Sequence, residues 1–213
     1  MKVLLLSPYP EMLTHALEEA GDTVMDMYEY TAYGADFIVS FGNRSIVKDP
    51  MLSQNKDRII NIHIGFLPWN RGADPNFWSW FDDTPKGVTI HQIDEGIDTG
   101  GILVQEEIKK WRRDETLHSS WHLLMARAKA LFESEWKNIR RGSLPTRKPD
   151  KGTGSYHRSA DKERWLPGPA VDWTELPVKE VARMGREFRA SQHEKEDRRP
   201  RPRKYRQQAF KEF

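Results

Sequence analysis

Three polar residues have the types and spacing needed to transfer an acyl group: Asn61, His63 and Asp98. Asn61 and His63 lie two residues apart at the end of an expected strand, so their side chains leave the same face. An Asn amide can donate to an oxygen that gains negative charge, and an imidazole can accept the proton that an attacking amine loses. Asp98 lies in a glycine-rich loop, from which it can orient that imidazole and stabilise its cationic form.

Taken singly, each of these signals also has a structural interpretation. An Asn-x-His sequence at a strand end is more often part of a capped turn with a satisfied histidine. The loop from Asp94 to Gly101 is dense in Asp and Gly, which by itself indicates only a tight hairpin turn. The histidines at 118, 122 and 157 show no metal-ligand spacing, so no metal is expected.

The elements that must position these side chains alternate between strand-like and helix-like patterns. The expected strands are Lys2–Leu6, Thr23–Met27, Asp36–Ser40, Arg58–Ile62, Gly87–Ile93 and Ile102–Ile108. The expected helices are Met12–Ala20, Ala73–Phe81, a long helix from an N-cap at Asp114 to Gly142, and Val178–Ala190. This alternation predicts an α/β fold with a mixed, mostly parallel sheet and a ligand site at the carboxyl ends of its strands.

The composition bounds the class of protein. Hydrophobic residues make up 37% of the 213 residues, yet 8 Trp, 9 Phe and 6 Tyr supply large groups for a core. The apolar run Val3–Leu6 ends at Ser7-Pro8, well short of the roughly 20 residues of a membrane helix. The absence of cysteine excludes a disulfide framework and fits a reducing compartment. We therefore expect a cytoplasmic protein without a membrane partner.

Charge and composition change after Gly142. Residues 1–142 hold 16 Lys and Arg against 21 Asp and Glu, whereas residues 143–213 hold 18 against 11. Glycines and prolines within 143–190 predict an irregular arm packed on the first domain, 1–142. Residues 191–213 have few apolar groups and predict a flexible basic tail. Such a tail can bind the phosphates of nucleic acid, although a solvated tail without function is an equal alternative.

A longer series of motifs adds to these signals. In chain order they are Asn61-Ile62-His63, Leu67-Pro68, Arg71-Gly72, Gly87-Val88-Thr89-Ile90 and Asp94-Glu95-Gly96-Ile97-Asp98-Thr99-Gly100. This series resembles the formyltransferase family that includes methionyl-tRNA and glycinamide ribonucleotide formyltransferases. The runs Leu67–Pro75, Thr84–His91 and Leu103–Ile108 are similar to compact sugar N-formyltransferases and to the formylation domain of a peptide synthetase. The resemblance implies an abbreviated Rossmann-like formyltransferase domain with a C-terminal arm.

The resemblance also implies roles for individual residues. Asn61, His63 and Asp98 match the family's catalytic Asn, His and Asp, with 10-formyltetrahydrofolate as the formyl donor. Folate would contact two loops largely through backbone groups. The candidate cofactor-binding residues in those loops are Asn43, Arg44, Ser45, Ile46, Asp94 and Gly96. The chain departs from the family pattern at Ile64-Gly65-Phe66, where many relatives have Pro-Ser-Leu. His91, beside the second loop, can touch the folate side of the site, although a hydrogen-bonded structural histidine is the favoured interpretation.

The amine acceptor is less constrained. Arg71, Asp74 and Asn76 are candidate acceptor contacts, because an amine and a phosphate each need an opposite charge. For Arg71 a structural ion pair is an equal alternative. The resemblance favours a nucleotide-linked amino sugar, with an aminoacyl group on a carrier or tRNA as the alternative. A folate or nucleic-acid binder without catalysis, a hydrolase that releases formate, and a homodimer also stay open.

Overall fold

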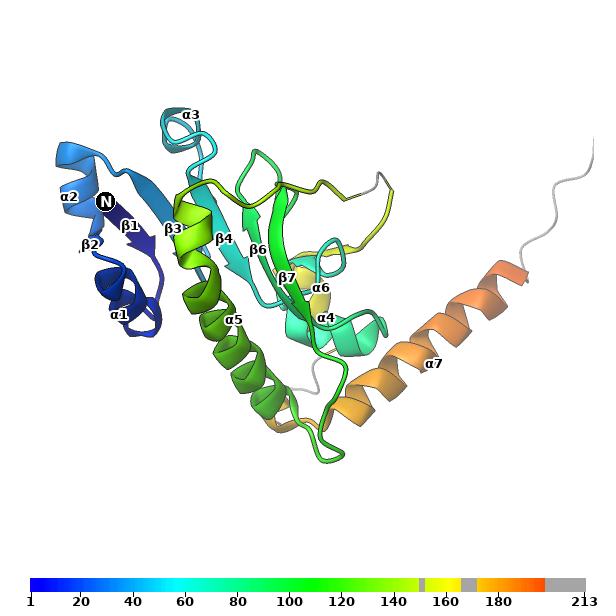
Figure 1. The fold of residues 1–213 in the computed structure, drawn as a ribbon. Coiled ribbons are helices and arrows are strands. Elements are labelled where there is room, and N and C mark those ends of the chain that lie inside the picture. The colour runs from blue at the N-terminus through cyan, green and yellow to red at the C-terminus, as the bar shows by residue number, and fades with distance from the viewer. Residues whose placement is uncertain (150–151, 166–171, 198–213) are drawn as a thin grey trace, which may run out of the picture.

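The computed structural model describes residues 1–149, 152–165 and 172–197. Its centre is a six-stranded sheet with the strand order β2-β1-β3-β4-β6-β7 (Figure 1). Strands β2, β1, β3 and β4 pair in parallel, whereas β6 and β7 join antiparallel. These strands are β1 Lys2–Leu6, β2 Thr23–Met25, β3 Phe37–Phe41, β4 Ile59–His63, β6 Gly87–Gln92 and β7 Ile102–Glu107. The mixed, mostly parallel sheet confirms the predicted fold class.

Helices connect the strands and cover the sheet, and α5 lies along its length (Figure 1). They are α1 Glu11–Glu19, α2 Met27–Tyr33, α3 Met51–Gln54, α4 Pro75–Phe81, α5 Leu117–Arg140, α6 Ser159–Glu163, α7 Val178–Asp197 and the 3-10 turn Trp173–Glu175. Two short strands, β5 Arg71–Gly72 and β8 Tyr156–His157, form a separate parallel pair. Among the residues that the structure describes, no helix is long and apolar enough to cross a bilayer.

Strand β4 divides its side chains between two environments. Ile60 and Ile62 are buried in the main apolar core, which also contains Leu124 of α5. Asn61 and His63 point to the other face, because successive side chains of a strand alternate. Strand β4 is therefore anchored in the core by Ile60 and Ile62, and it presents the polar side chains of Asn61 and His63 on its other face.

The start of α5 differs from the prediction. Thr116, not Asp114, is the N-cap: its hydroxyl accepts from the Ser119 N–H at 3.1 Å, and the Ser119 hydroxyl accepts from the Thr116 N–H at 2.9 Å. Asp114 instead forms an exposed ion pair with Arg112 at 2.9 Å. Two residue types that cap helices well stand two positions apart here, and the reciprocal bond of the capping box favours the second.

Helix α2 was not predicted from the sequence. None of its seven residues is buried, so it lacks the apolar periodicity that reveals a helix. Its signal is a capping box, in which Asp26 accepts from the Glu29 N–H at 2.8 Å and Glu29 accepts from the Asp26 N–H at 3.0 Å. Because Asp26 caps this helix, the expected strand Thr23–Met27 ends at Met25.

The residues after α5 return to the core at several places. Arg147 forms a two-way backbone bridge with Ile102 at the start of β7, and β8 pairs with β5. Helix α7 packs on α4, and the Arg189 guanidinium donates to the carbonyl of Phe81. The helix continues to Asp197, seven residues beyond the expected end, and its far half projects from the body (Figure 1). The division at 142 and 190 stays a prediction, and tail residues 198–213 lie outside the described residues.

Candidate functional site

Asn61, His63 and Asp98 lie together over one face of the sheet. The Asp98 carboxylate, from the loop between β6 and β7, places Oδ1 3.4 Å from Asn61 Nδ2 and Oδ2 3.6 Å from His63 Nδ1. The side chains of His63 and Asp98 are only 7% and 12% exposed. The fold therefore brings together residues that are 37 positions apart in the chain, in a setting largely shielded from water.

Hydrogen bonds fix both the side chain of Asp98 and the loop that carries it. The backbone N–H of Gly72, in β5, donates to Asp98 Oδ2 at 2.8 Å. Within the loop, Asp94 Oδ1 accepts from the Gly96 N–H at 3.1 Å and from the Thr99 hydroxyl at 2.5 Å. The backbone of Asp98 is left-handed, with φ 52°, a conformation that Asp tolerates better than most residues. Asp94 and Gly96 thus shape the turn that presents Asp98.

A fourth side chain, His91, completes the cluster. Its Nε2 lies 3.3 Å from Asn61 Nδ2 and 3.4 Å from Asp98 Oδ1. Its Nδ1 lies 2.8 Å from the carbonyl of Gln92, and a carbonyl only accepts, so Nδ1 carries the proton of the neutral ring. The sequence favours a structural role for His91 over a contact on the folate side of the site. It does not reveal the antiparallel register of β6, which places His91 opposite Asn61.

The imidazole of His63 is fixed by the backbone of the following loop. Its Nε2 lies 3.0 Å from the carbonyl of Asn70, so Nε2 carries the proton in the neutral ring. The basic nitrogen is then Nδ1, which faces Asp98. Gly65 leaves room for this arrangement, because a Cβ there would lie 2.6 Å from His63 Nε2. This is one consequence of the departure at Ile64-Gly65-Phe66 from the family pattern.

The electrostatics of the cluster favour a neutral imidazole beside a charged carboxylate. Burial lowers the pKa of His63, and the attraction of Asp98 only partly opposes this effect. Burial alone would raise the pKa of Asp98, but attraction to His63 and His91 when these rings are protonated, together with the Gly72 N–H, holds that pKa below its usual range. His63 is therefore available as a base near neutral pH. Within the described ranges, no group of three or more His, Asp or Glu residues is arranged to hold a metal.

The two candidate folate loops are anchored to the same apolar cluster. Val47, next to Ile46, and Ile93, next to Asp94, both pack against this cluster, which includes Ile59. Asn43 closes a turn, because its Oδ1 accepts from the Ser45 N–H at 3.1 Å and its Nδ2 donates to the Ser45 carbonyl at 2.9 Å. Arg44 is exposed, and Ile46 exposes 63% of its surface. An apolar side chain therefore faces solvent on one of these loops.

The three candidate acceptor contacts lie in different surroundings. Arg71 precedes Gly72, and its buried Nε has no hydrogen-bond partner among the described residues. Asp74 forms an ion pair with Lys162 of α6. Asn76 is buried between α4 and α5, where its amide donates to the Leu117 carbonyl at 2.9 Å and accepts from the Ser120 hydroxyl at 3.0 Å. Of the three, only Arg71 retains an unused donor next to the cluster.

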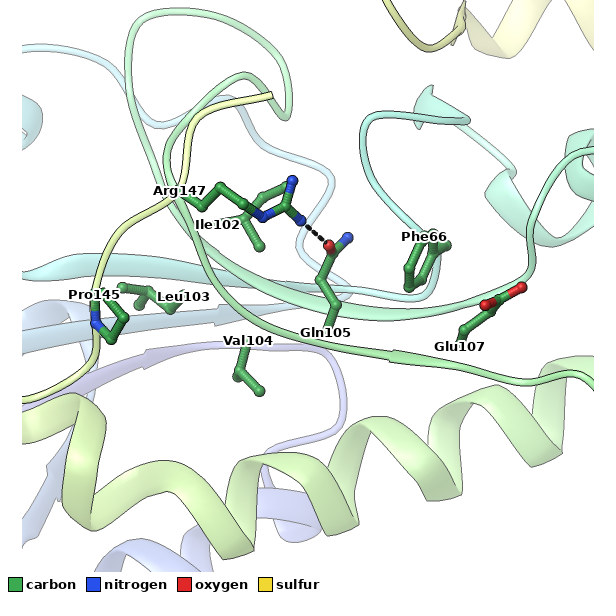
Figure 2. Close-up of a pocket in the computed structure, with 8 residues that line it drawn as sticks. All are labelled: Phe66, Ile102, Leu103, Val104, Gln105, Glu107, Pro145 and Arg147. Carbon is green, nitrogen blue, oxygen red and sulfur yellow. Dashed lines mark hydrogen bonds between the residues drawn. The ribbon is translucent and has the colours of Figure 1, made fainter. Parts of the chain in front are cut away.

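A groove of about 550 Å³ lies beside the edge strand β7 (Figure 2). Figure 2 shows Phe66, Gln105 and Arg147 on its walls, with the Arg147 guanidinium donating to the Gln105 amide oxygen. The Gln105 amide also donates to the Leu67 carbonyl at 2.7 Å, which ties the strand to the loop after His63. The groove is thus bounded by the same loop that fixes the His63 imidazole.

Comparison with known proteins identifies the family and agrees with this fold. Residues 10–130 match the family model described as formyl transferase, and the chain belongs to this family. It is 30% identical over 158 residues to a GDP-perosamine N-formyltransferase of Brucella melitensis, a match that covers 72% of this chain and 58% of that protein. It is 36% identical over 94 residues to a dTDP-4-amino-4,6-dideoxyglucose formyltransferase of Mycobacterium tuberculosis, covering 43% of this chain and 39% of that protein. The chain therefore spans less than two thirds of either relative.

A solved structure is similar over most of the chain. The formyltransferase PseJ of Anoxybacillus kamchatkensis, in complex with UDP-4,6-dideoxy-4-formamido-L-AltNAc and tetrahydrofolate, superposes with a TM-score of 0.79 at 39% identity. The match covers 86% of this chain and the whole of that one. The predicted family is thus confirmed by sequence and by structure.

Proposed function

We propose that this protein transfers the formyl group of 10-formyltetrahydrofolate to the primary amine of a nucleotide-linked amino sugar. The observation that carries the proposal is the buried cluster in which Asp98 lies between the His63 imidazole and the Asn61 amide. Relatives that act on nucleotide-linked amino sugars, and the sugar and tetrahydrofolate bound by PseJ, support the substrate class.

In the proposed mechanism, Nδ1 of neutral His63 accepts the proton that the attacking amine loses. The 3.6 Å separation from Asp98 Oδ2 is too long for a hydrogen bond, as expected while both atoms are acceptors. Once Nδ1 is protonated, the carboxylate stabilises the imidazolium. Asn61 exchanges its long contact with Asp98 for a hydrogen bond to the formyl oxygen as negative charge develops there.

Folate supplies the formyl carbon. When the tetrahedral intermediate collapses, the bond from that carbon to the folate nitrogen breaks, protonated His63 gives its proton to that nitrogen, and tetrahydrofolate leaves. We propose that Asn43, Arg44, Ser45, Ile46, Asp94 and Gly96 bind it, and the anchoring of both loops on one apolar cluster supports this assignment. The exposed Ile46 offers an apolar surface for a flat ring, and the turns at Asn43 and Asp94 fix backbone groups for hydrogen bonding.

For the acceptor we propose Arg71 as a contact to phosphate and the groove beside β7 as the site of the nucleotide. Phe66 is three residues from His63, and an extended chain of that length spans at most about 11 Å. The groove is therefore within reach of a sugar nucleotide whose amine lies at His63. In our proposal Asp74 and Asn76 stabilise the fold and do not contact the acceptor. Asp74 is already paired with Lys162, and Asn76 is buried between helices.

The test is a screen for formyl uptake with 10-formyltetrahydrofolate and three acceptor classes: nucleotide-linked amino sugars, aminoacyl carriers and aminoacyl-tRNA. We expect transfer to an amino sugar nucleotide, abolished in His63→Ala while folate binding is retained. Transfer only to a carrier or tRNA would show that the acceptor is an aminoacyl group and not an amino sugar. Release of formate without any acceptor would make the protein a hydrolase, and folate binding without turnover would make it a binder.

Three broader expectations accompany this proposal. We place the reaction in the cytoplasm because the cysteine-free composition fits a reducing compartment. A homodimer stays a prediction, as does binding of nucleic acid by the basic tail.

A further inference from the structure

The loop from Pro68 to Ala73 contacts the catalytic cluster through its backbone. The Asn70 carbonyl accepts from His63 Nε2 at 3.0 Å, and the Gly72 N–H donates to Asp98 Oδ2 at 2.8 Å. These two bonds decide which imidazole nitrogen is basic and where the carboxylate oxygen lies. The positions of Asn70 and Gly72 therefore matter as much to the cluster as the side chains themselves.

The same loop is bound on its other side by residues 154–157 of the C-terminal arm, which we call the strap. Ser155 holds the loop at three successive points: its N–H donates to the Pro68 carbonyl at 3.2 Å, its carbonyl accepts from the Arg71 N–H at 3.0 Å, and its hydroxyl accepts from the Asn70 N–H at 2.8 Å. The Ala73 N–H donates to the carbonyl of His157 at 2.9 Å.

Two glycines allow the strap to approach this closely. A Cβ on Gly154, where φ is 95°, would lie 2.0 Å from the Pro68 carbonyl oxygen. A Cβ on Gly72, where φ is 87°, would lie 2.3 Å from the His157 carbonyl oxygen. Any other residue at either position would have to displace backbone, so contact between strap and loop requires glycine on both sides.

The conformation of Asn70 shows why the loop needs support. Its backbone is left-handed, with φ 58°, and it is fully buried. Its side chain donates to the Thr84 hydroxyl at 2.7 Å and accepts from the Ser155 hydroxyl at 3.3 Å. Ser155 therefore contacts both the backbone N–H and the side chain of the residue whose carbonyl orients His63. A strained backbone of this kind persists when its surroundings hold it.

We infer that the strap is part of the catalytic apparatus, with Ser155 as a positioning residue that keeps His63 in the tautomer protonated on Nε2 and Asp98 beside Nδ1. The inference rests on the proposed function for its catalytic consequence. The tautomer itself is a property of the protein alone. Residues outside the first 142 thereby determine the state of side chains within them.

The experiment measures the His63 ring by 15N NMR in protein labelled at histidine, with the signals assigned through His63→Gln. In the unsubstituted protein we expect a single tautomer protonated on Nε2. Ser155→Ala should give a mixture of tautomers, Ser155→Thr should restore the single form, and Ser159→Ala, an exposed serine of the same arm, should change nothing. Gly154→Ala is a second way to loosen the strap and should match Ser155→Ala.

Formyl transfer is the second measurement. Ser155→Ala should lower kcat about tenfold by misplacing the base, with the KM for folate unchanged. An unchanged tautomer in a folded Ser155→Ala protein would overturn the inference, as would a lower melting temperature with an unchanged kcat and pH profile. If the unsubstituted protein transfers no formyl group, the proposed function fails, while the NMR result still decides the role of the strap.

Discussion

Two buried carboxylates in this protein have opposite surroundings. The Asp22 side chain is fully buried and accepts from Trp136 Nε1 at 2.7 Å, from the Met1 amino group at 2.9 Å and from both Nη atoms of Arg140 at 3.0 Å. Asp98 has one bond of comparable length, from a backbone N–H at 2.8 Å, and its other polar neighbours are 3.4 to 3.6 Å away. One carboxylate is saturated with short bonds, whereas two of the more distant neighbours of the other are imidazoles that can gain a proton.

The partners explain the difference. A guanidinium stays charged throughout the accessible pH range, so the ion pair of Asp22 with Arg140 persists whatever the protonation of the Met1 amino group, and it ties α5 to the start of β2. Imidazoles gain and lose protons near neutrality, so the contacts of Asp98 can change during a reaction. A buried carboxylate is thus better classified by whether its partners can change their protonation than by its burial.

The largest effect is expected at Asp98. Asp98→Asn keeps the shape of the side chain but removes the charge that stabilises an imidazolium, so kcat should fall about 1000-fold, or roughly 4 kcal/mol. Because the charge of Asp98 raises the pKa of His63, its removal lowers that pKa further. The acid limb of the rate profile, where the base becomes protonated, should therefore move to lower pH.

The measurement is kcat/KM for formyl transfer as a function of pH, with the melting temperature recorded for each protein. A melting temperature close to that of the unsubstituted protein is expected. A rate profile displaced to higher pH would contradict the arrangement, since it would mean that Asp98 does not act on His63.

Asp22→Asn should reverse this pattern. Removing one partner of a buried ion pair leaves Arg140 uncompensated, and the free energy of unfolding should drop by about 3 kcal/mol. The kcat and KM of the folded fraction should stay the same, because the cluster around Asp98 does not involve this pair. Urea unfolding, combined with kinetics well below the melting temperature, checks both expectations. A loss of kcat in fully folded protein would remove the distinction between the two carboxylates.

The sequence predicted the parts of the fold that have apolar periodicity. The strand Lys2–Leu6 was found with its exact ends, and β4 within one residue, because short apolar runs bounded by turn residues leave few alternatives. Helix α2 could not be found this way, since none of its residues is buried. The prediction of Asp114 as the cap of α5 was wrong, because the hydroxyl of Ser119 completes a capping box with Thr116.

For the candidate site, the sequence indicates the types of residue involved but not which residues contact one another. Asn61 and His63 follow from strand alternation, and Asp98 from its loop and the family resemblance. The place of His91 depends on an antiparallel register, and the roles of Asn70 and Ser155 depend on contacts of one loop with an arm 85 positions away. Arg71, Asp74 and Asn76 were all candidate acceptor contacts by residue type and position, and their surroundings in the fold separate them.

Asn76 provides the next, smaller test of this separation. Asn76→Ala removes a buried amide that joins α4 to α5 and leaves the Leu117 carbonyl with one partner fewer, which should cost about 2 kcal/mol of stability. The KM for the acceptor should not change. Arg71→Ala, the matched comparison, should raise that KM with little loss of stability. Steady-state kinetics on both proteins decides the matter, and a higher acceptor KM in Asn76→Ala would restore Asn76 as a contact residue.

The smallest expected effect is at His91, the residue of the cluster for which the sequence favoured a structural role. His91→Leu removes the acceptor for the Asn61 amide and one polar neighbour of Asp98, so kcat should fall about tenfold, or 1.4 kcal/mol. His91→Gln offers an amide oxygen in its place and should retain most of the rate. If His91→Leu loses stability while keeping its kcat, His91 belongs with Asp22 as a structural residue. A tenfold loss of kcat in His91→Leu that His91→Gln restores would place His91 with Asp98, because Gln, unlike Leu, offers an acceptor that can orient Asn61.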